Sequence, residues 1–125
     1  MRDFYFLFLF FNLNFNHYDM EYTEICKYIF SREIVNWEIR QIKTKKSKVV
    51  QARQASIYLG NWFLPYLSYD ELGLPFKKNR CNVYYSLKTM KNLLYSDKAM
   101  RKKINNYLLR IKKKINEKAK KEALI

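Results

Sequence analysis

Glycine and proline are scarce in this sequence, with two of each in 125 residues. An all-β fold needs turn residues about every ten positions, so the scarcity argues against strands joined by tight turns. Acidic residues are also few, since 11 Asp and Glu stand against 25 Lys and Arg and leave a formal net charge of +14. Hydrophobic residues make up 49% of the chain, enough for the core of one domain. The composition therefore predicts a single basic domain built from helices.

Cysteine and histidine are scarce as well. Cys26 and Cys81 lie far apart and form no Cys-x-x-Cys pair, and His17 is the one histidine. These residues cannot assemble a local zinc site, so we expect free thiols in a reducing cytoplasm and assign no role to His17. Gly60 and Gly73 stand outside any phosphate-binding loop, and no nucleophile–base pair or carboxylate dyad is visible. We therefore expect no enzymatic activity, no metal, no cofactor and no small-molecule substrate.

Positive charge is concentrated in the later part of the chain. Residues 43–125 hold 21 basic and 5 acidic residues. A field of this size attracts polyanions, among which nucleic acid is the commonest partner. A membrane surface and a merely solvated lysine-rich surface are the alternatives that charge alone leaves open.

Residues 4–15 form an apolar run, FYFLFLFFNLNF, which follows Arg2. The run is shorter than the ~20 residues of a membrane-spanning helix, and no small-residue cleavage site follows it. We predict that Met20 is the true start and that residues 1–19 are translated upstream sequence. An interfacial anchor and a strand added to the fold are the alternatives.

Apolar residues recur at helical spacing along the rest of the chain. We predict helices over residues 22–30, 33–42, 48–63, 68–74, 82–95 and 97–121. The predicted N-caps are Thr23, Ser47, Ser68 and Asp97. Glu71 completes a capping box with Ser68, Leu72 and Leu74 are expected to face inward, and Pro65 ends the preceding helix. The fold class is therefore all-α, with a domain over residues 20–96 and a long basic C-terminal helix over 97–125.

The apolar stripe of the last helix has two interpretations. Ile104, Leu108, Ile111 and Ile115 follow one another at steps of four, three and four residues. We favour packing of this stripe on the domain. A homodimer through the same helix is the alternative, although four positions are few for a coiled coil.

Residues 68–95 predict a short helix, a tight connection and a second helix. A helix-turn-helix uses the first helix as a brace and the start of the second to meet base edges. The residues around the start of the second helix are Lys77, Lys78, Asn79, Arg80, Cys81 and Asn82. Arg pairs bidentately with guanine and Asn with adenine, while Lys neutralises phosphate. A solvated loop before an ordinary helix is the alternative.

The order of these segments resembles the C-terminal DNA-binding domain (domain IV) of the bacterial chromosomal replication initiator protein DnaA. The matching residues are Val49, Val50, Ala52, Arg53, Gln54, Tyr58, Leu59, Leu67, Ser68, Glu71, Leu72, Gly73, Phe76, Val83, Leu87 and Met90. The resemblance covers residues 24–94 and implies a Trp-repressor-like helical domain that contains a helix-turn-helix. The chain lacks the Gly-Lys-Ser/Thr phosphate loop of the initiator's ATPase module.

The sequence departs from this family where the family reads bases. Residues 79–82 replace an Asp-His-Thr-Thr run, one residue is missing after Phe76, and Pro75 stands in the bracing helix. The resemblance therefore implies the fold and the phosphate contacts, but not the family's particular DNA box. Lysines also replace the family's minor-groove arginine in the basic loop, and Lys lacks its planar fork. Arg53 either holds phosphate, as the resemblance implies, or caps a buried carboxylate.

We therefore predict a cytoplasmic, nucleoid-associated protein that binds double-stranded DNA. It would act as a regulator or accessory of replication or transcription without ATPase activity. The predicted DNA-contacting residues are Lys43, Lys45, Lys46, Ser47, Lys48, Arg53, Ser68, Lys77, Lys78, Asn79, Arg80, Cys81, Asn82, Tyr85 and Lys88. An RNA-binding basic helical protein and a membrane-associated interaction protein are the alternatives.

Overall fold

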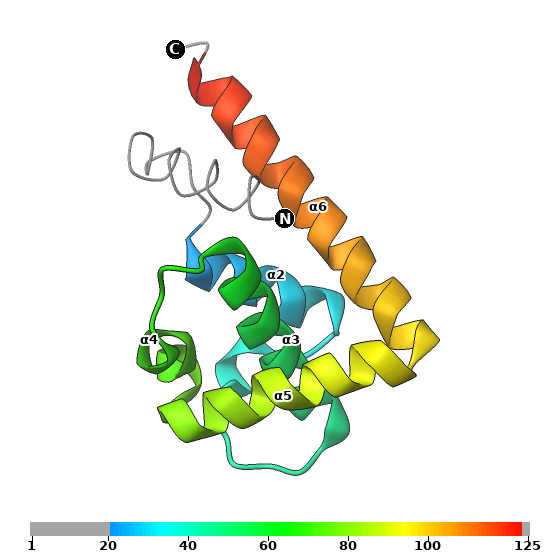
Figure 1. Ribbon diagram of the computed structural model, residues 1–125. Helices are drawn as coiled ribbons and strands as arrows, with labels where there is room; N and C mark the ends of the chain where they lie inside the picture. Colours follow the sequence, from blue (N-terminus) through cyan, green and yellow to red (C-terminus); the bar gives the residue numbers. More distant parts are fainter. Residues whose placement is uncertain (1–20, 124–125) are drawn as a thin grey trace.

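The computed structural model describes residues 21–123, and the predictions made for residues 1–19 and for Met20 lie outside this range. The described part consists of α-helices and two 3-10 turns and contains no strand, which confirms the all-helical class (Figure 1). The elements are α2 (Tyr22–Arg32), η2 (Trp37–Ile39), α3 (Ser47–Phe63), α4 (Tyr69–Gly73), η3 (Leu74–Phe76), α5 (Arg80–Ser96) and α6 (Lys98–Ala123).

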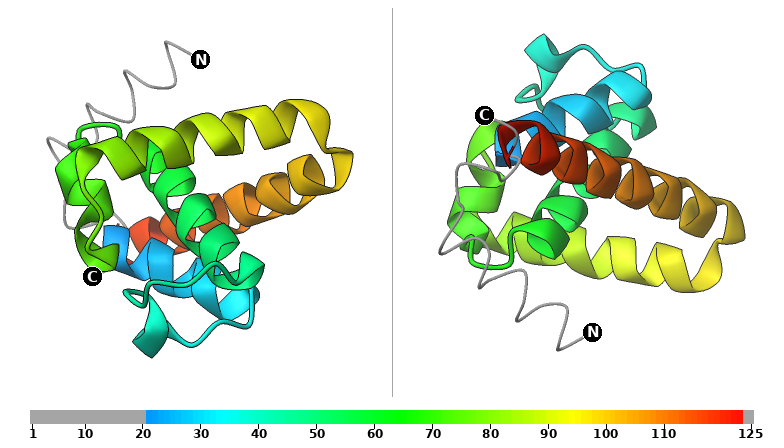
Figure 2. Two further views of the ribbon diagram at one scale, coloured as in Figure 1. Left: turned by 90° about the horizontal axis from the view of Figure 1, so that it is seen from below. Right: turned by 90° about the horizontal axis from the view of Figure 1, so that it is seen from above.

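The central helix is α3, which packs against α2 on one side and α5 on the other (Figure 2). Small residues make this close packing possible. The ring of Tyr22 occupies the space where a side chain at Gly60 would begin. Ser56 is fully buried, and its hydroxyl donates a hydrogen bond of 2.7 Å to the carbonyl of Ala52. The buried hydroxyl is therefore satisfied within its own helix.

Two clusters of buried side chains form the core. The first joins α2, α3 and α6 through Ile25, Ile29, Ala55, Leu59, Phe63, Ile104, Tyr107 and Ile111. The second joins α2 and α3 to α4, η3 and α5 through Cys26, Phe30, Val49, Ala52, Ile57, Leu72, Phe76, Val83 and Leu87. The predicted stripe of α6 packs on the domain through the first cluster, which confirms the favoured interpretation.

Two of the four predicted N-caps are confirmed. Ser68 and Glu71 form the complete capping box of α4, with both hydrogen bonds at 3.1 Å. Asp97 precedes α6, and its Oδ1 accepts a hydrogen bond of 3.1 Å from the Met100 amide.

The other two predicted N-caps are wrong, because α2 begins two residues earlier than a cap at Thr23 implies and α3 one residue earlier than a cap at Ser47 implies. Thr23 lies inside α2, whose N-cap is Glu21. Ser47 is the first residue of α3, whose N-cap is Lys46. The amide of Lys46 is held by the hydroxyl of Thr44 at 3.1 Å, and this loop contact sets where the helix begins.

The short helix and exit predicted over 33–42 are reduced to a single 3-10 turn. The chain turns sharply at Ile34, which has a φ of 58° and is 84% exposed. The amide of Val35 then bonds back to the carbonyl of Phe30 at 2.9 Å, which closes α2. Only Trp37–Ile39 follow as a 3-10 turn, capped by the side chain of Asn36. A local reversal of the backbone therefore overrides the apolar spacing.

Two smaller predictions about the following segment need correction. Leu74 is 74% exposed, although its spacing from the fully buried Leu72 indicated an inward position. The reason is that α4 ends at Gly73 and the chain tightens into η3, which rotates Leu74 away from the core. Helix α5 begins at Arg80 rather than at residue 82, because the side chain of Asn79 caps it.

Candidate nucleic-acid interface

A turn at residues 77–79 joins the α4–η3 segment to α5, where the sequence predicts a bend between Phe76 and Asn82. Lys77 adopts the left-handed conformation, with a φ of 52°. The amide of Lys78 donates to the carbonyl of Gly73 at 3.0 Å, and a side chain at Gly73 would overlap the Lys78 carbonyl oxygen. The predicted bend is therefore confirmed, and the absence of a side chain at residue 73 allows it to close.

Both sides of this turn are anchored in the core. Phe76 and Val83 are fully buried on either side of it. The ring of Phe76 stacks on that of Phe30, with the centroids 5.8 Å apart. The hydroxyl of Tyr22 donates a hydrogen bond of 2.6 Å to the carbonyl of Leu72, which ties α2 to α4. The position of the first turns of α5 is consequently set by the second core cluster.

The leading end of α5 is exposed on the face opposite its core residues. Val83, Leu87 and Met90 point inward. The exposed residues of the same stretch are Arg80, Cys81, Asn82, Tyr84, Tyr85 and Lys88. Five of these six are predicted DNA contacts; Tyr84 is the addition. The structure therefore presents polar and cationic side chains together at one helix end.

Asn79 has a structural role at this end. Its Oδ1 accepts hydrogen bonds from the backbone amide of Asn82 at 3.0 Å and from the Asn82 side chain at 3.2 Å. Such a cap satisfies a backbone donor that the helix leaves unpaired. Asn79 and Asn82 are both predicted to select bases. Asn79 caps α5, whereas Asn82 lies within α5 and is exposed.

Arg80 forms an ion pair with Asp70 of α4. The Nη2–Oδ2 distance is 3.1 Å, and the two side chains are 74% and 60% exposed. Pairs this exposed contribute little to stability, about 1 kcal/mol or less. Asp70 is not among the predicted contacts, because only the turn brings it close to α5. Ser68, a further predicted contact, is exposed, and its Oγ accepts the capping bond from Glu71.

The basic loop before α3 is exposed at every predicted contact residue, namely Lys43, Lys45, Lys46, Ser47 and Lys48. Arg53 lies behind this loop and is only 6% exposed. Its Nη1 donates to the carbonyls of Arg40 at 3.3 Å and Ile42 at 2.9 Å. Burial lowers the pKa of its guanidinium. Arg53 therefore fixes the path of the chain into the loop, a role that neither predicted alternative named.

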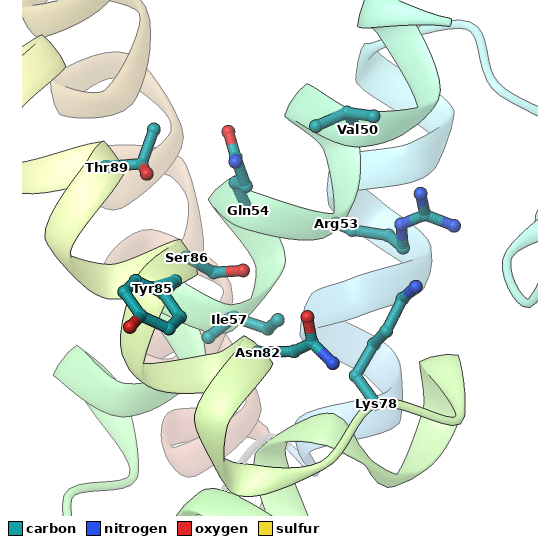
Figure 3. A pocket seen from close by; sticks show the side chains of 9 residues that line it. All are labelled: Val50, Arg53, Gln54, Ile57, Lys78, Asn82, Tyr85, Ser86 and Thr89. Carbon is teal, nitrogen blue, oxygen red and sulfur yellow. The ribbon is translucent and has the colours of Figure 1, made fainter. Parts of the chain in front are cut away.

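A notch of about 220 Å³ lies between α3 and the leading half of α5 (Figure 3). It is lined by Val50, Arg53, Gln54, Ile57, Lys78, Asn82, Tyr85, Ser86 and Thr89. The lining contains two cations, two amides and three hydroxyls but no carboxylate, so its chemistry suits an oxygen anion such as phosphate.

Gln54, Ser86 and Thr89 are the polar lining residues of this notch that are not among the predicted contacts, and Val50 and Ile57 are the apolar ones. Helical spacing from Asn82 to positions 86 and 89 places all three residues on one side of α5. That signal could have found Ser86 and Thr89. Gln54 required the knowledge that α3 and α5 are neighbours.

The described part of the chain, residues 21–123, contains two cysteines and no cluster of three potential metal ligands. Cys26 is buried and Cys81 is exposed, both as free thiols. No helix in this range is both long and apolar enough to cross a membrane.

No protein-family model, curated protein or solved structure matches the chain.

Proposed function

We propose that the protein binds double-stranded DNA through a helix-turn-helix formed by α4, the turn at 77–79 and α5, without catalysing a reaction. One observation carries this proposal. The first turns of α5 are anchored in the core by Val83 and Leu87, and they expose Arg80, Asn82 and Tyr85 to solvent. A helix held in this way can enter the major groove end first, as the second helix of a helix-turn-helix does.

Phosphate contacts would come from both sides of this helix. Lys77 and Lys88 are exposed on or beside α5, and the exposed lysines of the loop over 43–48 lie at the start of α3. In the left view of Figure 2, α3 runs between that loop and α5. Lys78, Ser86 and Thr89 line the notch, which can hold a backbone phosphate. Such contacts position a protein on the duplex but carry no sequence information.

Base selection would depend on Arg80 and Asn82. Arg pairs bidentately with guanine and Asn with adenine in the major groove. To do so, Arg80 must leave Asp70, which costs little because the pair is exposed to water. The expected selectivity is modest, since only two side chains of this kind stand at the helix end.

The resemblance to domain IV of DnaA supports the same proposal. Lys77 stands near the Gly-Arg of that family, and the left-handed φ of 52° at Lys77 is a conformation that favours glycine. We infer a regulator or accessory of replication or transcription, localised with the DNA in the cytoplasm.

The proposal is tested by measuring duplex binding over a range of salt concentrations. Binding that neutralises phosphates falls linearly with log salt, with a slope of about −0.9 per phosphate contact. We expect a steep slope for the full chain and a shallower one for Lys45→Ala/Lys46→Ala. Lys120→Ala/Lys121→Ala is a matched control, since it removes two exposed lysines from the far end of α6. Preference for single-stranded or structured RNA in competition would favour the RNA-binding alternative.

Base selection is tested with Arg80→Ala in a selection from degenerate duplexes. The variant should flatten the preference among sequences more than it weakens overall binding. Lys88→Ala is the control, because a phosphate contact should weaken binding to all sequences alike. Equal affinity of the parent protein for unrelated duplexes, unchanged by Arg80→Ala, would refute specific readout.

A further inference from the structure

A second cationic cavity, of about 360 Å³, lies between α2 and α6. It is lined by Tyr28, Arg32, Ala99, Lys102, Lys103, Asn106, Tyr107 and Arg110. Four of these eight residues are Lys or Arg, contributed by two helices. None of them lines the notch beside α5. This α2–α6 groove is therefore a separate concentration of positive charge.

Most of the charge in the groove is not neutralised. Glu33 accepts two hydrogen bonds from Lys103 Nζ, at 2.9 and 3.1 Å, and its side chain is only 11% exposed. Among the described residues, no carboxylate forms an ion pair with Arg32, Lys102 or Arg110. All three are exposed. Three uncompensated cations facing one cavity repel one another unless an anion joins them.

The groove also contains a hydroxyl without a partner. The hydroxyl oxygen of Tyr28 is buried and forms no hydrogen bond with the described part of the chain. An unpaired buried polar group is unfavourable, and a ligand oxygen is one way to satisfy it. Asn106, beside it in the lining, adds an amide donor. The cavity therefore offers neutral donors as well as charge.

Hydrogen-bond donors, two of them cationic, form a row along α6. Lys102, Asn106 and Arg110 follow one another at steps of four residues, about 6 Å each at the rise of an α-helix. The row continues to Lys114, whose Nζ lies 4.3 Å from the centroid of the Tyr28 ring. A row of donors that extends past the cavity fits a linear chain of phosphates better than a single compact anion.

The groove receives no side chain from the proposed DNA-reading helix. In the right view of Figure 2, α2 and α5 lie on opposite sides of α6. The residues that line the groove are also distinct from the predicted DNA contacts on α5 and in the loop over 43–48. The same molecule therefore has two cationic surfaces, one beside α5 and one between α2 and α6.

We propose that the α2–α6 groove binds the phosphate backbone of a second DNA duplex, so that one molecule bridges two DNA segments. This inference rests on the proposed binding of a first duplex by α5. Contact in the groove is with phosphates only, so the second duplex is held without regard to its sequence.

Bridging is tested with the full chain and two duplexes, one immobilised on beads and the other labelled and free in solution. The parent protein should recover the labelled duplex on the beads. Arg32→Ala/Arg110→Ala should reduce this recovery by about tenfold, because it removes two phosphate contacts from the groove. Binding to a single duplex should change much less. Lys120→Ala/Lys121→Ala removes the same charge elsewhere on α6 and should bridge like the parent.

The outcomes separate this inference from the proposed function. If a single duplex is not bound at all, the proposed function fails. If a single duplex is bound but the labelled one is not recovered, the bridging inference alone is overturned. Recovery that survives Arg32→Ala/Arg110→Ala, together with a doubled protein mass in sedimentation, would assign bridging to a dimer and also overturn it. A further outcome is that NMR resonances of the groove residues shift with inorganic phosphate but not with a second duplex. That result would limit the site to small anions and would also overturn the bridging inference.

Discussion

Arg80 Nη2 lies 3.1 Å from Asp70 Oδ2, so a carboxylate of the preceding helix holds the arginine at the leading end of α5. DNA would have to displace this carboxylate. We predict that Asp70→Asn strengthens duplex binding by about two- to fivefold, because an exposed pair is worth up to about 1 kcal/mol. The gain should shrink at high salt, where exposed charges are screened. Equilibrium titration at two salt concentrations measures both effects.

The control for Asp70→Asn is Glu117→Gln, which removes an exposed negative charge from α6. It should raise affinity less, since it lies on another helix. Both variants should keep their stability to within about 1 kcal/mol, although Asp70 also lies in the first turn of α4 and interacts with the helix dipole. An equal gain from the two variants would show that only net charge matters and that Arg80 is not held back by Asp70.

Lys77 combines an unfavourable backbone conformation with a predicted phosphate contact, and the two can be separated. The left-handed conformation costs an L-residue about 1–2 kcal/mol, whereas glycine loses about 0.5–1 kcal/mol more in chain entropy on folding. Lys77→Gly should therefore raise the free energy of unfolding by up to about 1 kcal/mol. It should also make the salt slope of DNA binding shallower by about 0.9. Lys77→Ala is the matched control, with the same loss in binding and no gain in denaturant stability. A Gly variant that is less stable than the Ala variant would contradict the assigned turn conformation.

Structural features that depend on neighbouring residues in the sequence are predicted best. The capping box of Ser68 and Glu71 and the cap at Asp97 are short-range patterns, and both are correct. The helix predicted through Ile34 and the inward position predicted for Leu74 are wrong. Apolar spacing assumes that a helix continues, whereas the backbone changes course at both places and ends the helix. The interior stripe of α5 follows helical periodicity and is correct.

The charged contacts were harder to predict because they join residues that only the tertiary structure brings together. Asp70 meets Arg80 across the turn at 77–79, and Lys103 meets Glu33 across 70 residues of chain. The sequence positions of the basic residues do not show which of their side chains lie in the same groove. Arg53 shows the same limit. From the sequence we predict that it binds a phosphate or a carboxylate, whereas its guanidinium donates to two backbone carbonyls.

The stability of the core should depend on pH in the alkaline range. Burial raises the pKa of the Cys26 thiol from 9.0 to about 12 and also raises that of the Tyr22 hydroxyl above its usual value. The folded state therefore binds these protons more tightly than the unfolded state does. This contribution is fully present below pH 9.0 and is lost as the pH rises toward about 12. Urea unfolding in the presence of a reductant should show a free energy that declines across this window.

Two cysteine variants separate this effect from a general loss of stability at high pH. Cys26→Ala should lower stability at all pH values, since it leaves a small cavity, but its decline above pH 9.0 should be shallower. Cys81→Ser, at an exposed position, should follow the parent curve. Identical slopes for Cys26→Ala and the parent would mean that the thiol does not contribute to the decline.

Arg53 offers a direct test of whether the basic loop must be held in place for binding. In Arg53→Met the carbonyls of Arg40 and Ile42 lose their donor, so we expect a loss of about 1–3 kcal/mol in the free energy of unfolding. Amide hydrogen exchange over residues 43–46 should accelerate, and duplex affinity should fall because the loop lysines lose their fixed positions. Arg53→Lys keeps the charge, but its shorter side chain does not place a nitrogen where Nη1 donates to both carbonyls. If Lys restores DNA binding without restoring protection of the loop, Arg53 contacts phosphate; if it restores neither, its role is to hold the loop.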